Sequence, residues 1–183
     1  MVVSLLEFSN TLIVNNRDPT DKKALKELWE KKPVVLLFLR RLGCMLCRNY
    51  AKEMDKVRPL IETKGGRVVA LSFEAFGEGS DADHSFNKLQ FWTGPIYKID
   101  QSVYDKLFGS KKLLDNLFGI LDMKKEAVEK ARADKTPGNF SGNGFILGGQ
   151  FVVNTDGKVV LDHRQKVFGD DASYEELYDA ISS

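Results

Sequence analysis

The stretch RRLGCMLCRNY, residues Arg40–Tyr50, holds both cysteines of this 183-residue chain. Cys44 and Cys47 are separated by two residues and accompanied by three arginines. The run Val34–Leu39 precedes the stretch and is apolar at both alternating sets of positions. A strand that is apolar on both faces is typical of the centre of a sheet covered on each side. The sequence therefore predicts a buried central strand that leads into the cysteines.

A helix is predicted to begin at Cys44, because apolar residues then recur every three or four positions. Pro59 is a candidate kink in this helix, and the pair of glycines at 65–66 should end it. A second buried strand is expected at 67–74. Two strands joined by a helix in this way run parallel, with a right-handed crossover. The repeating apolar positions of the helix are Leu46, Tyr50, Met54, Val57 and Ile61.

The same patterns predict the remaining elements of one domain spanning residues 1–183. Thr155-Asp156-Gly157 lies between two short apolar runs and predicts a tight hairpin. Alternating units followed by a late hairpin indicate an α/β fold with a mixed central sheet and helices on both faces. Strands are expected at 10–15, 96–99, 150–154 and 158–163, and helices at 21–31 (capped by Thr20 or Asp21), 83–91, 105–133 with a break near Gly119, and 174–181.

Composition argues against nucleic-acid and membrane-spanning classes. The formal net charge is +1, and lysine and arginine show no clustered excess. The longest clear apolar run is far shorter than the roughly 20 residues that span a bilayer. The first residues make a poor secretory signal, so a cytoplasmic location is expected. Structural disulfides are rare there, and the two cysteines therefore need another explanation.

Three explanations compete for the cysteines. A structural zinc site needs four ligands, usually in two close pairs, and only His84 and His163, far apart in the chain, could complete the set. Two inert core thiols are possible because free cysteine is often buried. A redox pair is favoured, because a Cys-x-x-Cys that follows a buried strand and opens a helix is a specific arrangement.

Physical chemistry distinguishes the two sulfurs. Unpaired N–H groups and the dipole at a helix N-terminus favour an anion, and nearby arginines add positive charge. Such surroundings lower a cysteine pKa from about 8.5 to roughly 3.5–7.5. Cys47 borders the buried stripe of the helix, whereas Cys44 precedes it and is expected to be more exposed. Cys44 is therefore the predicted nucleophile and Cys47 the predicted resolving thiol.

Three segments together resemble the peroxiredoxin-like 2 family, which is of the AhpC/TSA type within the thioredoxin-like superfamily. They are 39–48, 96–107 and 138–153, and they occur in the family's order. Two departures are visible. The Thr-x-x-Cys of peroxiredoxins is replaced by Cys44-x-x-Cys47, so the peroxiredoxin nucleophile would correspond to the second cysteine. Gly148 and Gly149 stand where thioredoxins have a proline.

The resemblance implies a thioredoxin-like fold and a thiol-dependent oxidoreductase that reduces an organic peroxide or endoperoxide. Prostaglandin H2 and prostamide H2, reduced to the F2-alpha product, are the implied endoperoxides. No bound cofactor is expected, NADPH is the implied ultimate reductant, and a thioredoxin-type donor is a possible partner. Arg41 or Arg48 is the expected stabiliser of the developing oxyanion. A general lipid-hydroperoxide or thiol-redox antioxidant, and a redox-sensing binding protein, remain alternatives.

A fatty substrate would need an apolar groove beside the cysteines. The glycine-rich segment 136–149 is either a flexible connection or backbone brought close to the substrate. Aromatic residues are usually core, but six could line such a groove. They are Phe73, Phe76, Phe91, Trp92, Phe140 and Phe145.

Overall fold

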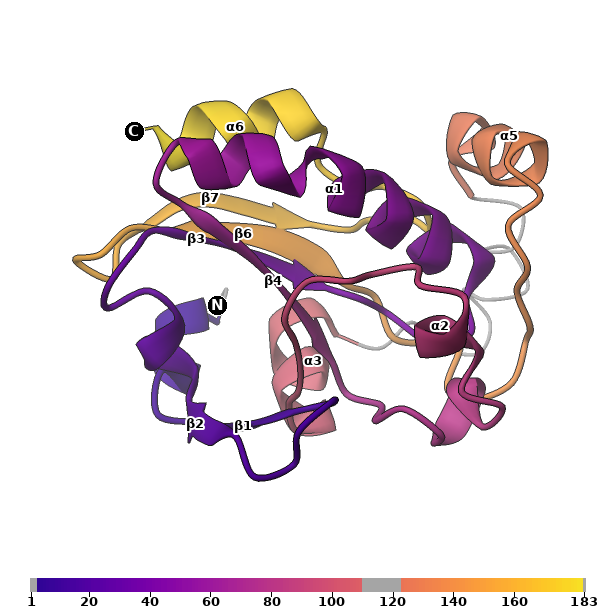
Figure 1. Cartoon of the computed structure of the whole chain (residues 1–183), viewed down its shortest axis with the longest axis horizontal. Coiled ribbons are helices and arrows are strands. Elements are labelled where there is room, and N and C mark those ends of the chain that lie inside the picture. Colours follow the sequence, from indigo (N-terminus) through magenta and orange to yellow (C-terminus); the bar gives the residue numbers. More distant parts are fainter. Residues whose placement is uncertain (1–2, 110–122, 183) are drawn as a thin grey trace.

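The computed structural model describes residues 3–109 and 123–182, and its strands form one mixed sheet (Figure 1). The strand order is β2-β1-β5-β4-β3-β6-β7. The β3–β4 and β4–β5 pairs are parallel, and the other pairs are antiparallel. The strands are β1 (Leu12–Asn15), β2 (Lys22–Ala24), β3 (Val34–Phe38), β4 (Arg67–Ser72), β5 (Ile96–Lys98), β6 (Gly149–Val153) and β7 (Val159–Arg164).

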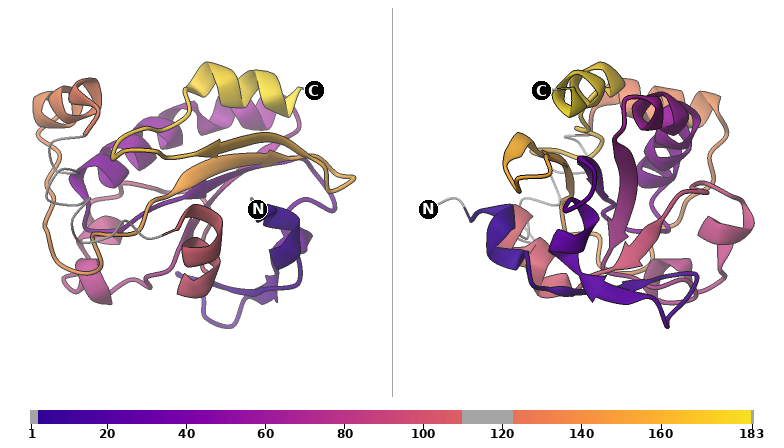
Figure 2. Two further views of the ribbon diagram at one scale, coloured as in Figure 1. Left: turned by 180° about the vertical axis from the view of Figure 1, so that it is seen from behind. Right: turned by 60° about the vertical axis from the view of Figure 1, so that its left-hand side comes forward.

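Helices cover both faces of the sheet. Figures 1 and 2 show α1 and α6 on one face, and α3 with the N-terminal segment on the other. The helix α5 lies at the end of the molecule where α1 begins. The α-helices are α1 (Met45–Thr63), α2 (Ser85–Lys88), α3 (Gln101–Phe108), α5 (Lys125–Ala133) and α6 (Tyr174–Ile181), and the 3-10 helices are η1 (Leu5–Phe8), η2 (Leu25–Leu28) and η3 (Gly79–Asp81).

The central strand β3 is buried on both faces, as its sequence predicts. Val34, Leu36 and Phe38 pack with Val103, Tyr104 and Leu107 of α3. Val35 and Leu37 face the other way, in a second core formed with α1 and α6. Because β3 pairs with β4 on one side and β6 on the other, its carboxyl end is held at the middle of the sheet edge.

The predicted hairpin is also confirmed, since β6 and β7 pair across it within the same sheet. The amide of Gly157 donates to the carbonyl of Asn154, and Gly157 has φ +79°, a conformation that side chains disfavour. The predicted crossover from β3 through α1 to a parallel β4 is observed as well. Pro59 does not divide α1, which continues to Thr63.

Several predicted boundaries are wrong. The predicted helix 21–31 is instead β2 followed by η2, because Lys22–Ala24 pairs with β1 at the sheet edge. The predicted helix 83–91 shrinks to α2, since His84 and Gln90 adopt left-handed backbone conformations. The predicted strand 67–74 ends at Ser72.

The long predicted helix 105–133 also differs from the structure. The observed α3 begins earlier, at Gln101, because the Asp100 side chain accepts a hydrogen bond from the amide of Ser102. It ends at Phe108, before Gly109 with φ +70°. The break predicted near Gly119 lies outside the described residues.

Candidate active site

The Cys-x-x-Cys lies where the sequence predicts it, at the carboxyl end of β3. Cys44 is the N-cap residue of α1, and Cys47 lies in its first turn. Ligands of open α/β sheets bind at this edge. The turn between β3 and α1 thus presents both sulfurs at the position where such folds carry out chemistry.

Both cysteines are buried, so the prediction that Cys44 is more exposed is wrong. Their exposed fractions are 5% for Cys44 and 7% for Cys47. Both pack in a cluster with Leu46, Ala131 of α5 and Phe168. This cover comes from segments far along the chain, which local periodicity does not predict.

The two sulfurs differ in access to a cavity instead. A cavity of about 490 Å³ is lined by Cys44 but not by Cys47. That volume is within the roughly 300–1,000 Å³ typical of small-molecule sites. Its walls come from the turn before α1, from α5 and from the glycine-rich segment. The cavity therefore gives a ligand access to the first sulfur only.

Arg40 contacts the Cys44 sulfur directly. Its Nη2 donates a hydrogen bond to Cys44 Sγ at 3.1 Å, and its Nη1 donates to the Gly144 carbonyl at 3.0 Å. The guanidinium carbon lies 3.9 Å from the centre of the Phe168 ring. Arg40 is only 5% exposed, so its charge acts in a region of low dielectric constant.

These contacts push the two thiol pKa values apart. The Cys47 side chain, which hydrogen-bonds to Cys44, and the charges of Arg40 and Arg41 hold the pKa of Cys44 well below its usual value. The hydrogen bond to Cys44 and burial raise the pKa of Cys47 well above its usual value. These directions favour Cys44 over Cys47 as the thiol that ionises in the reduced pair.

Arg41 and Arg48 occupy different places. Arg41 lines the cavity and donates to the carbonyls of Asn139 (3.1 Å) and Ser141. Arg48 does not line it. Its Nε donates to the Leu42 carbonyl at 2.6 Å, and Nη2 lies 3.6 Å from the carboxylate of buried Asp81. The positions favour Arg40 and Arg41 over Arg48 for contact with a ligand, and Arg40 was not among the oxyanion residues predicted.

A buried carboxylate holds the turn before Cys44. The amide of Leu42 donates to Glu74 Oε2 at 2.9 Å, and the amide of Gly43 donates to Ser80 Oγ at 2.7 Å. Ser80 Oγ in turn donates to Glu74 Oε2 at 2.6 Å. Glu74 follows β4 and carries no motif, so sequence reasoning missed it. Its effect is to fix the backbone that positions Cys44.

The glycine-rich segment 136–149 packs against this turn. The amide of Asn139 donates to the Gly43 carbonyl at 2.8 Å. A Cβ on Gly138 would lie 2.7 Å from the Met45 nitrogen, and one on Gly148 would lie 2.2 Å from the Phe38 carbonyl oxygen. Side chains do not fit at such distances, so these two glycines permit the close approach. Of the two interpretations of the segment, backbone placed beside the cysteines fits the geometry.

Known proteins share this arrangement of sequence and fold. A family described as AhpC/TSA antioxidant enzyme matches residues 49–167. Prostamide/prostaglandin F synthase of Xenopus tropicalis is 34% identical over 156 residues, which are 84% of this chain and 75% of that protein. Peroxiredoxin-like 2A of the same species is 30% identical over 166 residues, 89% and 69% of the two chains. This chain belongs to the AhpC/TSA antioxidant enzyme family.

Solved structures agree with this membership at the level of fold. Peroxiredoxin Q of Xanthomonas campestris superposes with a TM-score of 0.60 at 13% identity, covering 100% of this chain and 96% of that one. The fold is thus thioredoxin-like, and the resemblance to the peroxiredoxin-like 2 family is confirmed by the relatives. The segment that matches the AhpC/TSA family begins after Cys47, so both cysteines lie outside it.

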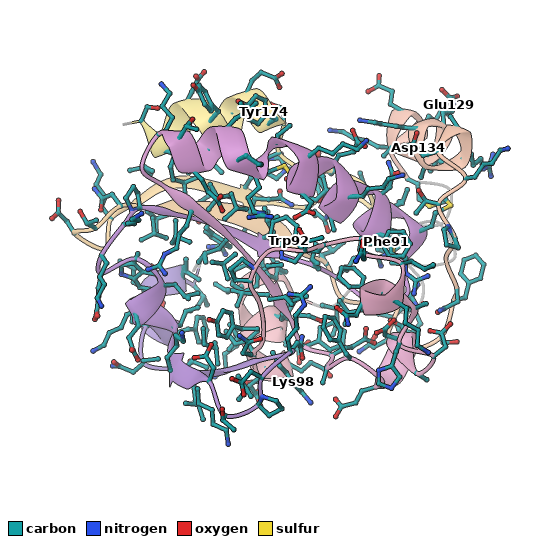
Figure 3. All side chains as sticks on the ribbon, in the orientation of Figure 1. Phe91, Trp92, Lys98, Glu129, Asp134 and Tyr174 are labelled. Carbon is teal, nitrogen blue, oxygen red and sulfur yellow. The ribbon has the colours of Figure 1, made fainter. Side chains whose placement is uncertain are left out.

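Only two of the six candidate aromatics line the cavity of this AhpC/TSA protein, Phe140 and Phe145. Phe73, Phe76, Phe91 and Trp92 pack with the two cores of the sheet. Figure 3 shows Phe91 and Trp92 in the interior below α1. The residue type alone does not distinguish aromatics that line the cavity from aromatics in the core. The distinction depends on which segment of the chain covers each face of the sheet.

Two absences concern the described residues, 3–109 and 123–182. Within these ranges no three or more His, Cys, Asp or Glu side chains are grouped so that they could hold a metal ion. No helix of the same ranges is long and apolar enough to cross a membrane.

A second acidic group lies behind the site. Asp171 Oδ1 accepts hydrogen bonds from Gln150 Nε2 (2.8 Å) and Gln165 Nε2 (2.7 Å). Gln165 Oε1 accepts from the amide of Gly148 at 2.9 Å. Burial raises the pKa of Asp171 from 3.8 to about 6, despite the two amide donors, and the charge of Cys44 contributes. This carboxyl connects Gln150 of β6 with Gln165, which follows β7 and accepts from the glycine-rich segment.

Replacing Asp171 by Asn is expected to change how stability depends on pH. The pKa of Asp171 is higher in the folded than in the unfolded protein. The free energy of unfolding of the wild type is therefore not reduced by this group below about pH 4, and it falls as pH rises through 6 and the buried carboxyl ionises. The loss is at most about 3 kcal/mol. Asp171→Asn keeps an acceptor and cannot titrate, so the difference in unfolding free energy between wild type and variant should shift in favour of the variant between pH 4 and 7.

Urea unfolding at several pH values measures this difference. Asp156→Asn, in the exposed hairpin turn, is the matched control and should show no such change. Parallel pH curves for wild type and Asp171→Asn would contradict the prediction.

Proposed function

We propose that this chain is a thiol-dependent reductase of organic peroxides or endoperoxides that cycles between a Cys44/Cys47 dithiol and a disulfide. The observation that carries the proposal is the Arg40–Cys44 contact at the edge of a cavity reached by Cys44 alone. Two relatives are named prostamide/prostaglandin F synthase and peroxiredoxin-like 2A, which supports both a specific endoperoxide and a general peroxide as substrate.

In the first step the Cys44 thiolate attacks one oxygen of the O–O bond. An S–O bond forms, the O–O bond breaks, and the electron pair leaves on the second oxygen as an alkoxide, which takes a proton from water. Arg40 and Arg41 line the same cavity and can stabilise this oxyanion. Sulfur is oxidised, and the peroxide oxygens are reduced.

In the second step Cys47 closes the disulfide. Its pKa is raised mainly by its hydrogen bond to Cys44 and by burial, and the Cys44 charge adds to this. The charge and the thiolate acceptor are consumed in the first step, so Cys47 then loses its proton more readily. It attacks the Cys44 sulfur, forms the S–S bond and releases the remaining oxygen as a second alkoxide, which takes the proton. An endoperoxide thus yields two hydroxyl groups on one product.

No bound cofactor enters either step. Regeneration needs a dithiol donor, for which a thioredoxin-type protein is the proposed partner and NADPH the proposed ultimate source of electrons. This cycle suits a reducing compartment, and we place it in the cytoplasm.

Turnover coupled to NADPH through thioredoxin and its reductase tests the proposal. Hydrogen peroxide, linoleic acid hydroperoxide and prostaglandin H2 are compared at equal concentration. Many equivalents of organic peroxide should be consumed per protein, faster than hydrogen peroxide. Consumption of a single equivalent would instead support the redox-sensing binding protein, and a preference for hydrogen peroxide would support a general antioxidant.

A further inference from the structure

The cavity beside Cys44 is apolar over most of its wall, and apart from Cys44 the charged described residues that line it are all arginines. They are Arg40, Arg41 and Arg132, and no carboxylate among the described residues lines the cavity. The cavity therefore combines an apolar surface with an excess of positive charge.

The two inner arginines already have partners. Arg40 hydrogen-bonds to the Cys44 sulfur and the Gly144 carbonyl, and Arg41 to the carbonyls of Asn139 and Ser141. Among the described groups that line the cavity, a Cys44 thiolate supplies one negative charge against these two buried cations. A further negative charge in the cavity is therefore favoured electrostatically.

Arg132 differs from them, because it is exposed and its guanidinium makes no hydrogen bond or ion pair with the described residues. It lies one turn after Val128 on α5, so the two share the face that borders the cavity. The acidic residues of α5 do not line the cavity, and Figure 3 shows Glu129 on the outer side of the helix. Neighbouring Lys130 is already paired, with Glu53 at 3.1 Å.

Apolar side chains at the mouth give a second, independent indication. Phe140 is 95% exposed and Phe145 is 39% exposed, although both are large and apolar. Apolar surface that is exposed as a contiguous patch often marks a ligand-binding groove. Together with Met45 they offer a surface for a hydrocarbon chain that leads from the solvent to Cys44.

We infer that the cavity binds an unesterified long-chain fatty acid peroxide, with the chain on Met45, Phe140 and Phe145 and the carboxylate on Arg132. The inference rests on the proposed function and specifies its substrate class. Arg132 then sets specificity by charge, and the peroxide group is left for Cys44 and Arg40. A neutral ester or amide of the same acid would lack the contact with Arg132.

Linoleic acid hydroperoxide and its methyl ester differ only in the carboxylate, so comparing their KM values isolates the contact with Arg132. The wild type should show a lower KM for the acid than for the ester. Arg132→Gln should raise the KM for the acid about fivefold, as an exposed ion pair worth about 1 kcal/mol allows, and leave the ester nearly unchanged. Arg132→Lys should restore part of the preference. Lys125→Gln removes the same charge from α5 outside the cavity and is the matched control.

Binding of dodecanoate and of 1-dodecanol to the reduced protein gives a readout that needs no turnover. Dodecanoate should bind more tightly than the alcohol, and Arg132→Gln should remove the difference. If no peroxide is turned over but this pattern holds, the proposed function fails and the fatty acid site stands. The inference is overturned if peroxides are turned over but Arg132→Gln leaves the KM values for acid and ester unchanged. In that outcome dodecanoate and 1-dodecanol also bind to the variant as tightly as to the wild type.

Discussion

Cys44→Ser should reduce peroxide turnover to background, a loss of at least about three orders of magnitude. A serine hydroxyl stays protonated near neutral pH and cannot replace the thiolate that Arg40 contacts at 3.1 Å. The variant should also lose rapid labelling by a small alkylating reagent at pH 7, because Cys47 stays buried, which raises its pKa, and does not line the cavity.

Cys47→Ser should behave differently and serves as the matched variant, since it also removes one buried sulfur from the same turn. It should carry out a single attack and stop, with Cys44 trapped as a sulfenic acid or sulfenate ester. Mass spectrometry detects the adduct, and oxidised wild type should instead lose two hydrogens, reversibly with a dithiol. Labelling of Cys47 first, with trapping in Cys44→Ser, would move the nucleophile to the second position, as in peroxiredoxins. Full turnover by both variants would end the two-cysteine proposal.

Arg40→Gln should raise the pKa of Cys44 and slow its reaction at neutral pH. An opposite charge within about 4–6 Å of an ionisable group changes its pKa by roughly 1–3 units, so the rate of alkylation below the pKa should fall by at least about tenfold. Arg40 donates to the sulfur itself, whereas Arg41 donates to main-chain carbonyls. Arg41→Gln should therefore produce a smaller change.

The pH dependence of alkylation measures this effect without relying on any substrate. Arg40→Lys keeps the charge but loses the paired contacts to Cys44 and Gly144, and should lie between wild type and Arg40→Gln. Circular dichroism and thermal unfolding show whether each variant is folded, since Arg40 is buried. An unchanged pH profile in folded Arg40→Gln would contradict the role assigned to this arginine.

The sequence by itself determined the features that depend on neighbours in the chain. The alternation of Val34–Phe38, the helical spacing after Cys44 and the turn at Gly157 are local signals, and the central strand, α1 and the hairpin follow them. The position of the cysteines at the sheet edge follows as well. The chain leaves β3 at its carboxyl end and enters α1, so the turn with the cysteines lies at that edge of the sheet. Local signals were weaker at 21–31, where pairing with β1 overrides the helical spacing of the leucines.

The tertiary structure alone decided which groups surround the sulfurs. Arg40 reaches Gly144 across 104 residues of sequence, Arg41 reaches Asn139 across 98, and the Leu42 amide reaches Glu74 across 32. The cover that buries Cys44 comes from α5 and from Phe168, which are also distant from it in the chain. Such contacts depend on how distant elements pack, and a thiol pKa depends on those contacts. The sequence could therefore place the two cysteines, but only the packed structure distinguishes the surroundings of the two sulfurs, and Arg40 from its neighbouring arginines.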